Sequence, residues 1–192
     1  KSMESAQKAL EIDESIPETH ALIGLLKIWK KDYDGAIAAA EKAVSLGPSS
    51  AEIHAELGML YRYVERFEES IRMTEKAIRL HPYYPDWYLY SLEYSYYYLG
   101  QHEKAIAIAK KHLELIKERG GTDTFWQHFI LAQNYIRIGQ IEEAQYHAAE
   151  GLRQNPDYTF KWEREGSMYK DPALIEQQIE DLRKAGLTCE GE

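Results

Sequence analysis

The sequence of 192 residues predicts an all-α fold built as an α-α solenoid. One observation is that similar residues recur at intervals of 34 positions, a length typical of a repeated helical hairpin. The other is that apolar and small residues recur at i, i+3, i+4 and i+7 and then stop at a short polar turn, which indicates two amphipathic helices per interval. The positions spaced by 34 are Ala9, Ala43 and Ala77; Gly24 and Gly58; His20 and His54; Ala36 and Ser70; and Pro48 and Pro82.

The spacing predicts a single solenoid domain made of successive helix pairs. Its expected parts are a half repeat at 1–16, units at 17–50, 51–85, 86–124 and 125–158, and a C-terminal capping region at 159–192. The equivalent positions Ala36, Ser70, Ala105 and Ala144 are separated by steps of 34, 35 and 39. We place the additional residues in loops, within 81–86 and around 117–123, because both stretches are rich in turn formers.

Capping signals mark where several helices begin. Residues 49–52 and 124–127 have the spacing of a capping box, and Asp171 followed by Pro172 predicts another helix start. The helix expected from Pro172 to about Ala185 has one apolar side and one charged side. The apolar side holds Leu174, Ile175, Ile179 and Leu182. A solenoid needs such a capping layer at its end, because its last repeat would otherwise expose apolar surface.

These residues resemble the tetratricopeptide repeat (TPR), whose 34-residue pattern has preferred leucine, glycine, tyrosine, alanine and proline positions. The leucine position is filled by Ile23, Leu57, Leu92 and Leu131; the glycine position by Gly24, Gly58, Glu93 and Ala132; the tyrosine position by Lys27, Tyr61, Tyr96 and Tyr135; and Pro48, Pro82 and Pro156 close three units. The sequence departs from the pattern at several positions. Lys27 replaces the tyrosine, Glu93 replaces the glycine, His112 and Gly151 replace the late alanine, and Lys117 stands where proline would fall. The resemblance implies a right-handed TPR superhelix whose first helices line the concave side.

The C-terminal sequence has a narrower resemblance. Residues 169–172 and 182–187, together with 81–88, are similar to the C-terminal TPR region of bacterial class III adenylate/guanylate cyclases and related TPR regulators. The resemblance implies that the chain is the regulatory part of a larger bacterial signalling protein, whose catalytic or DNA-binding part would precede Lys1. The half repeat at 1–16 likewise leads us to expect a further helix upstream.

Composition makes several classes of function unlikely. The formal net charge is -9, from 32 acidic and 23 basic residues, so we expect no nucleic-acid partner. No apolar run reaches the ~20 residues needed to span a bilayer, and the first residues lack the layout of a signal peptide, so we expect no membrane insertion. The single cysteine, Cys189, cannot form an internal disulfide. A reducing, cytoplasmic location is consistent with this.

No motif predicts catalysis, a metal or a cofactor. The histidines His20, His54 and His128 stand at one equivalent position of successive first helices, so we interpret them as packing residues in different layers rather than as ligands of one metal. His102 and His112 are interpreted as solvated or partly buried. The chain has neither a phosphate-binding glycine motif nor a recognisable nucleophile with its base. We therefore expect a protein that is not an enzyme.

An aromatic stripe is the strongest candidate for function. The helix expected at 87–99 has one apolar stripe for the core and a second stripe of tryptophan and tyrosine on its opposite side. An ordinary amphipathic helix would be polar on that side. By the resemblance this stripe faces a concave groove. The predicted groove residues are Trp29, Arg62, Tyr63, Trp87, Tyr90, Tyr94, Tyr97, Tyr98, Phe129, Gln133, Ile136 and Arg137. Tyrosine offers a large contact area with little rotamer entropy, so the stripe predicts binding of a protein or peptide.

The aromatic stripe has two alternative interpretations. The stripe could serve as a self-association surface that makes the chain a homo-oligomer and brings two upstream domains together. Individual tyrosines could also pack between adjacent first helices without touching a ligand. The resemblance to the TPR family raises a further possibility, a clamp of basic and asparagine residues for the C-terminal carboxylates of a ligand. This clamp is not evident, because its positions are occupied here by Ala21, Ala55, Leu25 and Met59.

Overall fold

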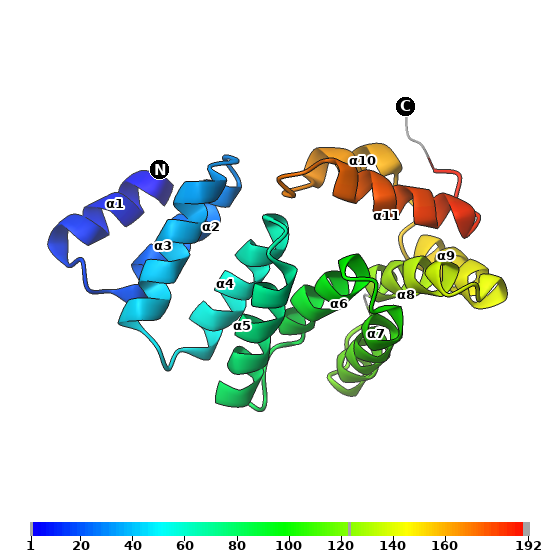
Figure 1. Cartoon of the computed structure of the whole chain (residues 1–192), viewed down its shortest axis with the longest axis horizontal. Helices are drawn as coiled ribbons and strands as arrows, with labels where there is room; N and C mark the ends of the chain where they lie inside the picture. The colour runs from blue at the N-terminus through cyan, green and yellow to red at the C-terminus, as the bar shows by residue number, and fades with distance from the viewer. Residues whose placement is uncertain (1, 123, 190–192) are drawn as a thin grey trace. The chain divides into compact units, whose positions relative to one another are not determined.

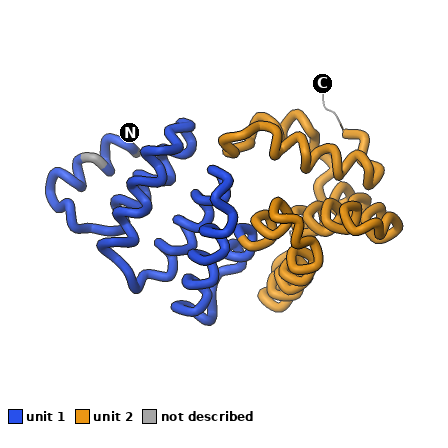
Figure 2. Tube along the Cα trace, viewed as in Figure 1, with its two compact units in different colours: residues 1–91 blue, residues 92–192 orange. Residues whose placement is uncertain are grey.

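The computed structural model describes residues 2–122 and 124–189, and the described part is helical throughout, with turns between the helices (Figure 1). It divides into two compact units, residues 1–91 and 92–192, with the boundary inside one helix (Figure 2). None of its helices has the length and the apolar character needed to cross a membrane.

Unit 1 consists mainly of antiparallel helix pairs. Its elements are α1 (Ser2–Ile12), α2 (Pro17–Ile28), α3 (Tyr33–Leu46), α4 (Ala51–Tyr63), α5 (Phe67–Leu80), the short 3-10 helix η1 (Asp86–Tyr88) and the start of α6 (Leu89–Tyr98). Helix α2 packs on α3 and α4 on α5, while α4 also contacts α2 and α3. The α2–α3 pair therefore stacks on the α4–α5 pair, and α1 packs on α2.

Unit 2 continues this arrangement and ends in two additional helices. Its elements are the rest of α6, then α7 (His102–Glu118), α8 (Phe125–Arg137), α9 (Ile141–Gln154), α10 (Phe160–Gly166) and α11 (Ala173–Lys184). Helix α8 packs on α7, on α9 and on α11. The predicted C-terminal helix at 172–185 is thus present as α11, and it packs on α8 (Figure 1).

Small side chains let the paired helices approach closely. The repeated alanines Ala36, Ala77, Ala105 and Ala144 are all fully buried. At Gly58 a Cβ would lie 2.5 Å from Thr74 Oγ1 and 3.1 Å from the main-chain oxygen of Ser70, so the α4–α5 contact requires glycine. The small residues of the pattern therefore form the interface between the two helices of a pair.

The turn inside each helix pair uses one left-handed residue at an equivalent position. These residues are Lys31, Glu65, Gly100 and Gly139, with φ of 59°, 64°, 69° and 76°. Glycine adopts this conformation without the steric cost that a side chain adds, so the turns of unit 2 are less strained than those of unit 1.

The predicted caps are confirmed only in part. The Ser50 hydroxyl accepts a hydrogen bond from the Ile53 amide, and Asp171 accepts one from the Ala173 amide at 2.8 Å. Thr124 does not cap α8, because both its amide and its hydroxyl donate to Gln154 Oε1 instead. The loop predicted at 117–123 begins later than expected, since α7 extends to Glu118, and Asp123 lies outside the described residues.

Candidate functional site

Unit 1 holds five of the predicted groove residues, and four of them keep part of their surface exposed. Trp29 follows the last residue of α2 and is 68% exposed. Leu22, seven positions earlier in the same helix, is 44% exposed. Tyr63 ends α4 and is half-buried, with the Arg62 guanidinium 4.5 Å from its ring centroid. Trp87 and Tyr90, from η1 and α6, are also half-buried. Arg62 itself is buried, so the accessible part of this surface is aromatic and aliphatic.

Unit 2 holds the other predicted groove residues, and its own helix α11 contacts four of them. The Tyr97 hydroxyl donates to Asp181 Oδ2 at 2.6 Å, and Arg137 Nε donates to the same oxygen at 2.6 Å. The Tyr98 hydroxyl donates to the main-chain oxygen of Leu174 at 3.1 Å and accepts a hydrogen bond from Gln178 Nε2. A longer contact of 3.5 Å joins Gln133 Nε2 to the main-chain oxygen of Gln178.

The carboxylate of Asp181 is the electrostatic centre of this contact. Asp181 is fully buried, whereas its partner Arg137 keeps about a third of its side chain exposed. Burial, and secondarily the negative charge of Asp181, raise the pKa of Tyr97 well above its ordinary value, so the hydroxyl keeps its proton and remains a donor. Charge-assisted bonds of this kind are among the stronger ones in proteins. Helix α11 is therefore held by a specific clamp as well as by apolar packing.

Several predicted groove residues are not open to a ligand. Tyr94, Tyr97, Phe129 and Gln133 are buried, so the expectation of a continuous exposed aromatic stripe is wrong for them. The physical reason in unit 2 is that α11 covers Tyr97 and Gln133, while Phe129 packs against Tyr158 with ring centroids 4.5 Å apart. Ile136 is half-buried. Binding of a peptide by any of the twelve residues stays a prediction.

Of the two first-helix histidines in unit 1, His54 packs inside the repeat as predicted, whereas His20 is only half-buried. His54 is fully buried and its Nδ1 lies 2.8 Å from the main-chain oxygen of Ser50, and burial lowers its pKa. His20 Nε2 contacts the main-chain oxygen of Glu14 at 2.9 Å. Within residues 2–122 and 124–189, no three histidine, cysteine or acidic side chains are grouped so that they could hold a metal ion.

His128 contacts a second histidine, His147 of α9, with 2.9 Å between the two Nδ1 atoms. Burial, and then the positive charge of His128, lower the pKa of His147 to about 4 from its ordinary 6.5. The unfolded chain therefore binds more protons than the folded chain between pH 6.5 and about 4. The stabilising contribution of a neutral His147 is complete above pH 6.5 and decreases as the pH falls.

Acidification is therefore expected to remove the stabilising contribution of His147. We predict that the free energy of unfolding falls by about 2 kcal/mol between pH 7.5 and pH 5 through His147 alone. Urea unfolding followed by circular dichroism at the two pH values measures this. The change between the two pH values should differ by about 2 kcal/mol between the unsubstituted chain and the variant His147→Gln, whereas the matched control His102→Gln should leave it unaltered. A pH dependence that is the same in His147→Gln and in the unsubstituted chain would contradict the prediction.

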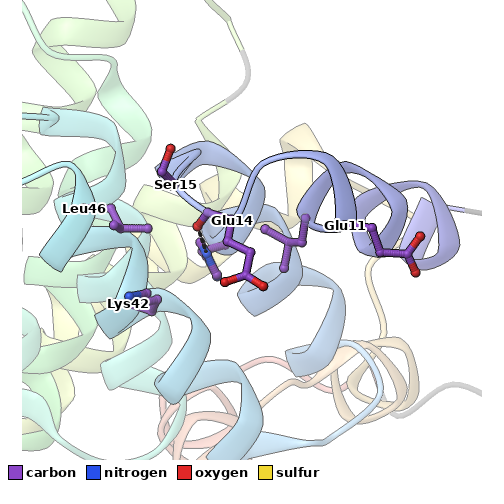
Figure 3. A pocket seen from close by; sticks show the side chains of 7 residues that line it. Glu11, Glu14, Ser15, Lys42 and Leu46 are labelled. Carbon is purple, nitrogen blue, oxygen red and sulfur yellow. Dashed lines mark hydrogen bonds between the residues drawn. The ribbon is translucent and has the colours of Figure 1, made fainter.

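A pocket of about 580 Å³ lies in unit 1 between α1, α2 and α3. Its lining comprises Leu10, Glu11, Glu14, Ser15, His20, Lys42 and Leu46, and Figure 3 shows these side chains around it. The Ser15 hydroxyl donates to Asp13 at 2.6 Å, and His20 is engaged with the Glu14 main chain. Serine and histidine are thus not arranged as a nucleophile and its base.

The sequence interpretation missed one buried polar cluster in unit 2. His112, expected to be solvated or partly buried, is fully buried, and its Nδ1 lies 2.8 Å from Glu93 Oε1. Gln127 Nε2 lies 3.3 Å from the same nitrogen. Glu93 replaces the pattern's glycine and His112 its late alanine, so the signal that could have revealed the pair was two departures in one repeat unit.

Comparison with known proteins supports the fold. The model of the family described as tetratricopeptide repeat matches residues 51–84. No curated protein matches the chain in sequence. Among solved structures, YrrB, described as a TPR protein with an unusual peptide-binding site, is 23% identical with a TM-score of 0.65, over 95% of this chain and 91% of that one.

Two further solved structures have the same architecture. PilW, described as a widely conserved type IV pilus biogenesis factor, is 21% identical with a TM-score of 0.73, over 94% of this chain and 78% of its own. TTC0263, a thermophilic TPR protein of Thermus thermophilus, is 21% identical with a TM-score of 0.66, over 94% and 89% of the two chains. Residues 51–84 are therefore a tetratricopeptide repeat, and the chain has the all-α superhelical fold of tetratricopeptide-repeat proteins.

Proposed function

We propose that this chain is a non-catalytic scaffold that binds a protein or peptide on the first helices of its repeats. The observation that carries the proposal is the exposed apolar surface of unit 1, where Trp29 is 68% and Leu22 is 44% exposed. Exposed apolar side chains gathered on one surface are typical of interaction sites. The peptide-binding site in the description of YrrB, which has the same fold, is consistent with this use.

The scaffold would be the regulatory C-terminal part of a larger bacterial signalling protein, such as a nucleotide cyclase, and would act in the cytoplasm without a cofactor. This part of the proposal rests on the resemblance of residues 169–172 and 182–187 to the C-terminal sequences of such proteins. The division into a half repeat, four units and a cap belongs to the same proposal. It implies that ligand binding here changes the activity of a domain outside the chain.

A binding experiment on matched variants tests the scaffold function. The chain is immobilised and used to select peptides from a displayed library, and the double variant Trp29→Ala, Tyr63→Ala is compared with the control Tyr146→Ala. Tyr146 is 62% exposed but lies on α9, a second helix. We expect the double variant to bind the selected peptides at least about tenfold more weakly, because large aromatic anchors carry much of the energy of an interface.

The control should bind as the unsubstituted chain does, and circular dichroism should show equal helicity in all three. Light scattering on the same samples separates ligand binding from self-association. A dimer that the double variant abolishes, together with no selected peptide, would favour self-association over the scaffold proposed here. Equal peptide binding by the double variant and the control would refute the assignment to the surface around Trp29.

A further inference from the structure

Helix α11 lies on a surface of unit 2 that has the composition of a binding site. We define the α11 seat as Tyr97, Tyr98, Gln133 and Arg137, the four predicted groove residues that contact this helix. We infer that the α11 seat is a receptor for an amphipathic helix of a partner protein that presents a carboxylate, and that α11 occupies the seat when the partner is absent. The inference deepens the proposed scaffold function and rests on it, because it names the class of ligand.

The first requirement that the seat places on a ligand is a carboxylate. Tyr97 and Arg137 direct their donors to one oxygen, Asp181 Oδ2, each at 2.6 Å. They come from different first helices, α6 and α8, so both helices must be in place for the clamp to exist. An asparagine or a leucine at this point of a ligand would lose the charge-assisted bonds, so the clamp selects for an acidic residue.

The second requirement is a helical backbone with an apolar side. Tyr98 and Gln133 donate to the main-chain oxygens of Leu174 and Gln178, and such oxygens are present in any helix. The apolar side chains that α11 buries are Ile175, Ile179 and Leu182, at spacings of four and three residues. Asp181 follows Ile175 by six positions. A ligand therefore needs an i, i+4, i+7 apolar row with an acid at i+6, which is a pattern that many helices meet.

The contact with α11 is incomplete, and this favours a different occupant. Asp181 Oδ1 and Gln133 Oε1 are buried without a hydrogen-bond partner among the described residues. A buried polar atom without a partner lowers the stability of the contact that contains it. The tether to α10 compensates for this by keeping α11 at a high effective concentration. The α11 of a second copy of the chain would leave the same two oxygens without hydrogen bonds and would lack the tether. A helix of another protein is therefore the better competitor for the α11 seat.

The test measures whether the seat accepts a free helix once α11 is weakened. The probe is a fluorescent peptide of residues 171–188, used with a version carrying Asp181→Asn. The chains are the unsubstituted chain, Ile179→Glu, which places a charge on the buried side of α11, and the control Glu180→Gln on its exposed side. We expect the peptide to bind Ile179→Glu at least about tenfold more tightly than either other chain, because its own α11 no longer competes.

Two further comparisons tie binding to the seat. The Asp181→Asn peptide should bind Ile179→Glu about tenfold more weakly than the peptide with aspartate, and adding Arg137→Ala to that chain should produce a similar loss. Circular dichroism shows whether Ile179→Glu keeps the other helices. The milder chain variant Asp181→Asn gives a second measurement, with peptide affinity expected between those of the unsubstituted chain and Ile179→Glu.

The inference is overturned if the two peptides bind equally, if neither binds Ile179→Glu or the Asp181→Asn chain, or if light scattering shows a dimer that exchanges α11 between copies. These outcomes differ from failure of the scaffold function, which is measured by library peptides and depends on Trp29. Library peptides that bind through Trp29 while the residue 171–188 peptide fails would leave the scaffold standing and remove the seat.

Discussion

Replacing His112 by alanine is expected to lower the free energy of unfolding by about 3 kcal/mol. His112 and Glu93 are both fully buried, with 2.8 Å between His112 Nδ1 and Glu93 Oε1. Removing the imidazole takes the hydrogen-bond partner of Glu93 Oε1 away from a buried carboxyl, and it also opens a cavity between α6 and α7. Urea unfolding followed by circular dichroism measures the change.

A double-mutant cycle separates the pair from the cavity. The pattern offers natural replacements, since Ala132 stands at the position of Glu93 in the last unit and Ala77 at that of His112 in an earlier one. The double variant Glu93→Ala, His112→Ala should be less destabilised than the sum of the two single variants by at least about 1 kcal/mol, because it leaves neither polar group alone. Additive single effects would show that the two side chains do not interact.

The sequence predicts the helices well because their signals are local and repeated. The period of 34 residues predicts equivalent positions such as Ala36 and Ala105, and both alanines are fully buried in the structure. Capping bonds are less predictable: α8 begins after Thr124 as expected, but the Thr124 hydroxyl donates to Gln154, thirty positions away, and does not cap the helix. Long-range contacts of this kind leave no periodic pattern.

The candidate site could be predicted only in part. The second aromatic stripe was recognised as a surface that needs a partner, and in unit 2 it does have one. That partner is the chain's own α11, joined to the stripe through Tyr97 and Asp181, which are 84 positions apart. An apolar row on α11 predicts burial equally well against a neighbouring repeat or inside a groove. The path of the chain after α9 decides which of the two surfaces α11 covers. Tertiary contacts set that path, and the sequence pattern does not show them.

Departures from the repeat pattern prove more informative when they are considered in pairs. Glu93 and His112 are one such pair. Gly151, at the late alanine position, and Phe129, whose equivalents in the first two units are the small residues Ala21 and Ala55, form another pair between α8 and α9. A Cβ on Gly151 would lie 2.5 Å from Cε1 and 2.6 Å from Cδ1 of Phe129. The larger ring thus requires the smaller residue across the helix interface.

Replacing Phe129 by alanine is accordingly expected to cost about 3–5 kcal/mol of unfolding free energy, since the ring is almost completely buried against Tyr158 and Phe125. In the unsubstituted chain Gly151→Ala should cost about 1–3 kcal/mol, because the added methyl group overlaps the ring. In the Phe129→Ala chain the same substitution should instead stabilise by about 0.5–1 kcal/mol, because alanine favours the helix more than glycine does.

The reversal of sign is the decisive feature of this cycle. Gly166→Ala is the matched control, since a Cβ there meets nothing within 4 Å, and its effect should be the same in both backgrounds. If Gly151→Ala destabilised both chains equally, the close approach of α9 to Phe129 would not be the reason for the glycine. If the sign reverses, Phe129 is a packing residue that fixes α8 against α9. Phe129 would then be excluded from the ligand surface of unit 2.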